Sequence, residues 1–128
     1  MDILLDTNVL LMPGSVGVDI VTQLQAAAPG RLCCLDRTID ELQNIVATQC
    51  GKHRQAAKLG LLLIEKGMVS PLKTEKVKKG AKSPSVDALL EEYAKKGYLV
   101  ATQDRALQRR LSRYLVLRQK KYFKLMGE

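Results

Sequence analysis

The sequence has few of the residues that carry nucleophilic, disulfide or zinc chemistry. It contains three cysteines and one histidine among 128 residues. Cys33 and Cys34 are adjacent and Cys50 is distant, which fits neither a metal-ligand spacing nor a disulfide framework, so we expect three reduced core residues. His53 stands in a polar stretch, and we expect it on the surface. Glycine-rich phosphate loops and serine or cysteine nucleophile motifs are also missing. Carboxylates remain as the candidates for chemistry.

Long apolar runs are absent as well. No run approaches the ~18 residues that a membrane span needs, and Met1-Asp2 offers no basic start for a signal peptide. The length is close to the commonest size of a single domain, and 46% hydrophobic residues suffice for one ordinary core. We therefore expect one domain over residues 1–128, located in the cytoplasm and not associated with a membrane.

Positive charge is concentrated in two segments of the chain. The net charge is +8, of which residues 101–128 carry +6 and residues 72–82 carry +4, whereas the remaining chain sums to −2. Clustered cations beside a mildly acidic body are typical of a face that binds a polyanion. The alternative is the solvated surface of a generally basic protein.

Short apolar runs alternate with segments of helical periodicity. We expect strands at 3–5, 31–35, 68–71, 98–101, 114–117 and 121–125, the last two as a hairpin. The first helical segments are one turn at 9–12, stopped by Pro13-Gly14, and a helix at 16–27. The next two are a helix capped by Asp36 or Thr38 and a helix at 52–66 whose second half is expected to be deeply buried. The last two are a helix that begins at Ser83-Pro84 and a basic helix at 104–113. Residues 72–83 read as an exposed loop. The alternation predicts an α/β fold with a mostly parallel sheet covered on both faces.

Four acids can reach the carboxyl edge of such a sheet. Asp6 and Asp104 each follow a predicted strand, and Glu41 and Asp87 lie in early turns of predicted helices. Ligands bind outside the carboxyl ends of strands in open parallel sheets. Four carboxylates at one place repel one another and call for a cation, and Mg²⁺ prefers oxygen ligands. The alternative is that these acids only cap helices or oppose helix dipoles.

Taken in order, these motifs resemble the PIN-domain nucleases. The resemblance rests on Asp6-Thr7-Asn8, then Glu41, then Asp87, then Thr102-Gln103-Asp104, and covers almost the whole chain. It implies a three-layer α/β/α sandwich and an endoribonuclease that depends on Mg²⁺ or Mn²⁺. It implies four catalytic acids: Asp6, Glu41, Asp87 and Asp104. Of these, Asp6, Asp87 and Asp104 are the expected metal ligands. Asn8 and Thr102 match polar positions that orient these carboxylates.

On this interpretation the basic segments hold the RNA backbone. The expected contacts are Lys73, Lys76, Lys78, Lys79, Lys82, Arg105, Arg109 and Arg110. Residues 101–123 resemble the branch of the family that processes ribosomal RNA precursors in archaea and eukaryotes. Many relatives carry another acid where Ala106 stands, which puts a tightly held second metal in doubt.

Other interpretations stay open at this stage. Within the family, the chain could be the toxin of a toxin–antitoxin pair, although an acid and an aromatic usually follow the last aspartate there, in place of Ala106 and Leu107. It could also be a non-catalytic RNA-binding module, or an interaction domain whose acids are only caps. Relatives often form homodimers, and the lack of a zinc module or long extension suggests that a protein partner supplies specificity.

Overall fold

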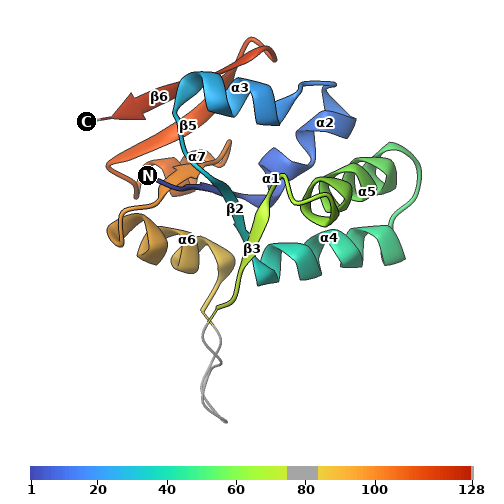
Figure 1. Cartoon of the computed structure of the whole chain (residues 1–128). Helices are drawn as coiled ribbons and strands as arrows, with labels where there is room; N and C mark the ends of the chain where they lie inside the picture. Colours follow the sequence, from blue (N-terminus) through green and yellow to red (C-terminus); the bar gives the residue numbers. More distant parts are fainter. Residues whose placement is uncertain (75–83, 128) are drawn as a thin grey trace.

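In the computed structural model, which describes residues 1–74 and 84–127, six strands form one sheet (Figure 1). The strands are β1 (Ile3–Leu5), β2 (Leu32–Leu35), β3 (Ser70–Leu72), β4 (Leu99–Ala101), β5 (Arg113–Arg118) and β6 (Tyr122–Gly127). Their order in the sheet is β3-β2-β1-β4-β5-β6. All pairings are parallel except that of β5 with β6, which form the expected antiparallel hairpin. The carboxyl ends of five strands therefore lie along the same edge.

Helices cover both faces of the sheet. They are α1 (Thr7–Leu10), α2 (Met12–Ser15), α3 (Ile20–Ala27), α4 (Asp36–Thr48), α5 (Gly51–Glu65), α6 (Val86–Lys95) and α7 (Arg105–Gln108). Ile3 and Leu5 of β1 belong to the core packed under α1 to α5, whereas Leu4 belongs to the core under α6 and α7. This alternation follows from the two-residue period of a strand. The structure confirms the predicted α/β/α sandwich.

The first two helices differ from the prediction. Pro13 and Gly14 lie inside α2 and do not stop a helix. Proline is tolerated in a first helical turn because its missing N–H would have had no helical partner there. Gly14 packs against the backbone of Ala56 in α5, so this position has no room for a side chain.

The second half of α5 is less buried than predicted. Leu59 and Leu62 are 41% and 39% exposed, while the small residues Ala56, Ala57 and Gly60 are the buried ones. The helix packs through these small residues on α1, α2 and α4 and forms the outside of its layer (Figure 1). Cys50, before α5, is exposed, so the prediction of three core cysteines holds only for the two in β2.

The first turn of α4 contacts Thr74 and Pro84, the two residues that flank the segment 75–83. That segment, which contains most of the predicted loop, lies outside the described residues. Asp36 accepts hydrogen bonds from the backbone N–H of Thr74 at 3.1 Å and from its hydroxyl at 2.9 Å. The guanidinium of Arg37 donates to the carbonyl oxygen of Pro84. Asp36 therefore joins α4 to the end of β3 and is not the predicted helix cap.

Two further helix ends were placed differently by the sequence. Ser85, and not Ser83, caps α6: its hydroxyl accepts a hydrogen bond from the N–H of Ala88 at 3.1 Å. The predicted basic helix over 104–113 is shorter, because α7 ends at Gln108. Among the helices that the structure describes, none has the length and apolar character to cross a membrane.

Candidate active site at the carboxyl edge of the sheet

Asp6 lies directly after the central strand and is held by three hydrogen bonds. Its Oδ1 accepts one from the N–H of Thr7 at 2.8 Å, which caps α1. Its Oδ2 accepts from the hydroxyl of Thr102 at 2.7 Å and from the side-chain amide of Asn8 at 3.3 Å. The residue is only 7% exposed. Its carboxylate is therefore fixed in orientation before any ligand binds.

Thr102 joins the two central strand ends. It is fully buried, donates its hydroxyl proton to Asp6 and accepts a hydrogen bond from the N–H of Asp104 at 3.1 Å. The side-chain oxygen of Asn8 accepts from the N–H of Gln103 at 3.4 Å. Asn8 and Thr102 thus both contact Asp6 and the segment after β4.

Asp104 caps α7. Its Oδ1 accepts hydrogen bonds from the N–H groups of Ala106 at 2.9 Å and Leu107 at 3.2 Å. Both bonds use the same oxygen, so capping and a second role for Oδ2 are compatible. Asp104 is therefore a helix cap, as the alternative interpretation held, and its Oδ2 can still bind a ligand.

Glu41 reaches the same edge from α4. Its Oε2 accepts a hydrogen bond from the hydroxyl of Thr7 at 3.2 Å, and that hydroxyl lies 3.5 Å from the hydroxyl oxygen of the buried Thr38. The sequence prediction did not assign Thr7 a role. Its position between Asp6 and Asn8 was the available signal, since a first-turn hydroxyl of α1 lies beside the carboxylate that begins the helix.

The four acids interact electrostatically. Burial raises the pKa of Asp6, hydrogen bonds from Thr102 and Thr7 oppose this, and the charges of Asp87 and Asp104 raise it further. The pKa of Glu41 is raised first by desolvation and also by the charges of Asp6 and Asp87, against the hydrogen bond from Thr7 and the charge of Arg37. Asp87, in the first turn of α6, therefore acts on two of the other acids.

The donor chemistry of the four acids fits a hard divalent cation. Within residues 1–74 and 84–127, no three His, Cys, Asp or Glu side chains are gathered as a ready metal cage. Mg²⁺ is usually held by one or two carboxylates together with waters and substrate phosphates, so such a cage is not required. A cation would also oppose both effects that raise the pKa of Asp6, which are burial first and then the charges of Asp87 and Asp104. Carboxylate oxygens suit Mn²⁺ equally.

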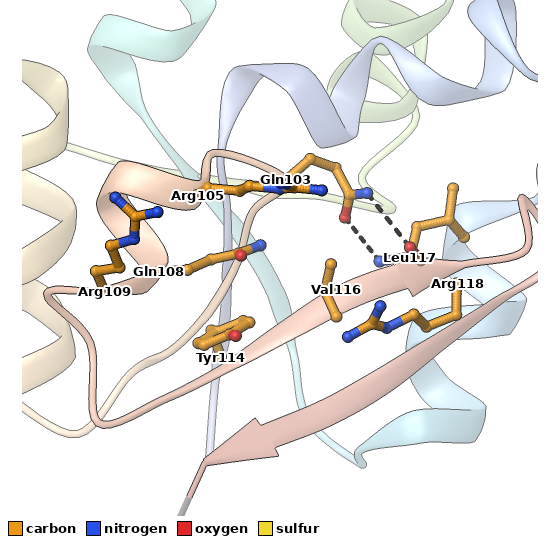
Figure 2. Close-up of a pocket in the computed structure, with 8 residues that line it drawn as sticks. All are labelled: Gln103, Arg105, Gln108, Arg109, Tyr114, Val116, Leu117 and Arg118. Carbon is orange, nitrogen blue, oxygen red and sulfur yellow. Dashed lines mark hydrogen bonds between the residues drawn. The ribbon is translucent and has the colours of Figure 1, made fainter.

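The predicted RNA contacts fall into four groups. Arg105 and Arg109 line a cavity of about 560 Å³ between α7 and β5 (Figure 2). Arg110 instead forms an ion pair of 2.8 Å with Glu91 of α6. Lys73 is exposed just after β3. The other four lysines lie outside the described residues: Lys76, Lys78, Lys79 and Lys82.

Sequence reasoning missed most of this cavity. Tyr114, Val116 and Arg118 line it because alternate residues of β5 point to the same face of the sheet. Gln103 and Gln108 line it from the other side. The alternation was readable in the predicted strand at 114–117, but only the structure shows that α7 leaves this part of the face uncovered.

Comparisons with known proteins identify the fold and the family of the chain. Comparison with curated protein sequences finds no significant match. Fifteen solved chains match significantly, among them the PIN domain endonuclease Utp24, with a TM-score of 0.73 and 18% identity over 99% of this chain and 92% of that chain. At that identity the likeness shows the fold. The model of the family described as PIN like domain matches residues 3–120. The chain therefore belongs to the PIN-like domain family.

Proposed function

We propose that this protein is a metal-dependent endoribonuclease that hydrolyses RNA phosphodiester bonds. The observation that carries the proposal is Asp6, a buried carboxylate held by three hydrogen bonds at the sheet edge, whose pKa is raised first by burial and further by the charges of Asp87 and Asp104. The chain belongs to the PIN-like domain family and has the fold of the PIN domain endonuclease Utp24, and both findings support the same chemistry.

The acids divide into metal ligands and a positioning group. Asp6, Asp87 and Asp104 would hold Mg²⁺ or Mn²⁺, directly or through water. The bound ion would supply an activated water and stabilise charge that develops on the phosphate. Glu41, held by Thr7 at one oxygen, would orient the attacking water with the other. Thr102 and Asn8 keep Asp6 in place.

We further propose precursor ribosomal RNA as the substrate class and the cytoplasm as the place of action. The support for the substrate is the resemblance of residues 101–123 to the branch that processes such precursors. We also propose a protein partner that selects the cleavage site, as expected from the lack of a zinc module in this sequence. The comparisons give no support to the expected homodimer, so the proposal is made for one chain.

The test is cleavage of an RNA with structured and single-stranded regions in Mg²⁺ or Mn²⁺, beside EDTA. The variant is Asp6→Asn, and the matched control is Asp19→Asn, which changes the exposed aspartate that caps α3. We expect the wild type and the control to cut only with metal. Asp6→Asn, shown to be folded by circular dichroism, should lose about 10²–10⁴-fold in rate.

Three outcomes would contradict parts of the proposal. Equal cleavage in EDTA would remove the metal. Equal cleavage by Asp6→Asn would remove the site. Bound but uncut RNA in every condition would favour a non-catalytic RNA-binding module over a nuclease.

A further inference from the structure

The cavity between α7 and β5 has the size and the position of a binding site next to the acids. Its volume of about 560 Å³ lies within the ~300–1,000 Å³ typical of small-ligand sites. It begins at Gln103, the residue between Thr102 and Asp104 (Figure 2). A chain bound in this cavity and continuing across the ends of β4 and β1 would therefore reach Asp104 and Asp6.

The cavity is cationic. Arg105, Arg109 and Arg118 line it, and none of the other lining residues in the described part of the chain is a carboxylate. None of the ion pairs found in the described part of the chain involves these three arginines. Like charges brought together without a counter-charge repel one another, so an anion bound among them is favoured. Guanidinium groups also match phosphate geometry through paired donors.

An aromatic surface accompanies the arginines. Tyr114 lines the cavity on the same face of β5 as Arg118. On β6, Tyr122 pairs with Arg118 and Lys124 pairs with Val116, and opposed residues of an antiparallel pair share a face. The face therefore continues beyond the cavity with an exposed tyrosine and a lysine. Cations interleaved with aromatic rings are the arrangement that binds single-stranded nucleic acid through its phosphates and bases.

Two glutamines fix the wall that faces the acids. The side chain of Gln103 donates to the carbonyl of Leu117 at 3.3 Å and accepts from its N–H at 2.7 Å (Figure 2). The side chain of Gln108 donates to the carbonyl of Thr102 at 2.7 Å. The cavity wall and the segment that holds Asp6 are thus one hydrogen-bonded unit, which fixes the distance between the two sites.

We propose that this cavity is a nucleotide subsite that holds an unpaired nucleotide of the RNA beside the scissile phosphate. The base stacks on Tyr114, and the flanking phosphates contact Arg118, Arg105 and Arg109. The inference rests on the proposed function, because it takes RNA as the ligand of the neighbouring acids. It predicts that the enzyme selects single-stranded positions, since a paired base cannot enter.

The test is binding of a fluorescent single-stranded ten-nucleotide RNA, followed by anisotropy in EDTA at fixed salt. Arg118→Gln should weaken binding about tenfold, whereas the matched control Arg54→Gln, on the exposed side of α5, should change it less than about twofold. Tyr114→Ala should weaken RNA binding about 5- to 150-fold, the range for one lost base–aromatic stack. Tyr114→Phe should bind like the wild type.

Inorganic polyphosphate separates the base from the phosphates. Arg118→Gln should weaken its binding as well, but Tyr114→Ala should not, because polyphosphate has no base to stack. Thermal melting shows whether Tyr114→Ala is folded. If Tyr114→Ala is unfolded, Arg118→Gln still tests the site, because it changes an exposed side chain.

Several results would overturn the subsite. One is RNA affinity in folded Tyr114→Ala or Arg118→Gln equal to that of the wild type. Another is a polyglutamate peptide that competes as strongly as RNA, which would assign the cavity to an acidic protein segment. Metal-dependent cleavage by the wild type, together with unchanged RNA affinity in these variants, would contradict the subsite and leave the proposed nuclease function standing. Bound but uncut RNA, with weakened variants, would remove the nuclease and support the subsite.

Discussion

Asp6 combines two conditions that disfavour its charge with one that preserves it. Burial and the neighbouring acids raise its pKa, and three hydrogen-bond donors hold the ionised carboxylate in place. Without a cation, ionisation of Asp6 therefore weakens the folded state. This arrangement is expected of a carboxylate whose negative charge is balanced by a bound cation. It also makes the stability of the metal-free protein depend on pH.

The metal-free wild type should lose stability relative to Asp6→Asn as pH rises from about 4. The pKa of Asp6 in the folded chain lies above its ordinary value of 3.8, so its contribution is full below that value and lost as pH rises through the folded pKa. The measurement is the difference between the two melting temperatures against pH, in EDTA.

Asp19→Asn is the control for this comparison. Hydrogen bonds from Thr22 lower the pKa of Asp19, so its contribution has the opposite sign: it is full above 3.8 and is lost as pH falls through the folded pKa. The melting temperature of the wild type should therefore rise relative to that of Asp19→Asn only as pH approaches 3.8 from below, and the difference should be nearly constant over the range in which the Asp6 difference changes. A melting difference between wild type and Asp6→Asn that is constant with pH would contradict the account of Asp6.

Single residues also show the limit of sequence reasoning. Asp6, Asp104 and Thr102 could be placed at the sheet edge because each follows an apolar strand of readable length. Thr7 and Gln103 could not, because their roles depend on which backbone or carboxylate lies opposite after folding. Gln103 contacts Leu117, fourteen positions away, through a strand pairing that no local pattern specifies.

At the scale of elements, the strands were placed within one or two residues, whereas several helix ends were not. The buried runs at β1, β2 and β4 are continuous and apolar, which leaves little ambiguity. The helix α7 ends at Gln108, just after the buried Leu107, whereas the prediction followed the basic residues and extended the helix to residue 113. The buried side of α5 was missed because alanine and glycine, and not its leucines, make the contact.

That contact leads to a prediction for α5. A Cβ at Gly60 would lie 2.7 Å from the carbonyl oxygen of Leu10 in α1. Gly60→Ala should therefore destabilise the protein by about 1–3 kcal/mol through overpacking, although alanine favours a helix over glycine by about 1 kcal/mol.

Urea unfolding measures this change in the free energy of unfolding. Gln55→Ala, at an exposed position of the same helix, is the control and should change stability by less than about 0.5 kcal/mol. A Gly60→Ala protein more stable than the wild type would show that α1 and α5 can separate without loss.

Over the whole molecule, the parallel sheet and the charge distribution act together. Parallel pairing brings the ends of β1 and β4 and the starts of α4 and α6 to one edge. The chain then adds cations beside that edge, within a net charge of +8. The fold class was predictable because alternation of strands and helices specifies it; the placement of cations around the edge required the structure.

RNA affinity should consequently fall with salt. Each phosphate contact on a single strand contributes about −0.7 to the slope of log affinity against log salt, so three cavity arginines predict a slope of about −2 or steeper. Arg118→Gln should make the slope shallower by about 0.7. Arg31→Gln, which removes a cation paired with Asp2 at 3.2 Å, should leave the slope unchanged. A wild-type slope near zero would contradict electrostatic binding.

The contacts made by Asp36 and Arg37 have a consequence for how this protein can vary. These adjacent residues bind Thr74 and Pro84, so both junctions of the segment 75–83 are fixed to one helical turn. The closure entropy of a connection between two fixed points rises only logarithmically with its length, by about 0.6 kcal/mol for each doubling. Between these junctions the chain can therefore acquire or exchange sequence with little effect on the acids, which makes this the natural place for new specificity to be inserted.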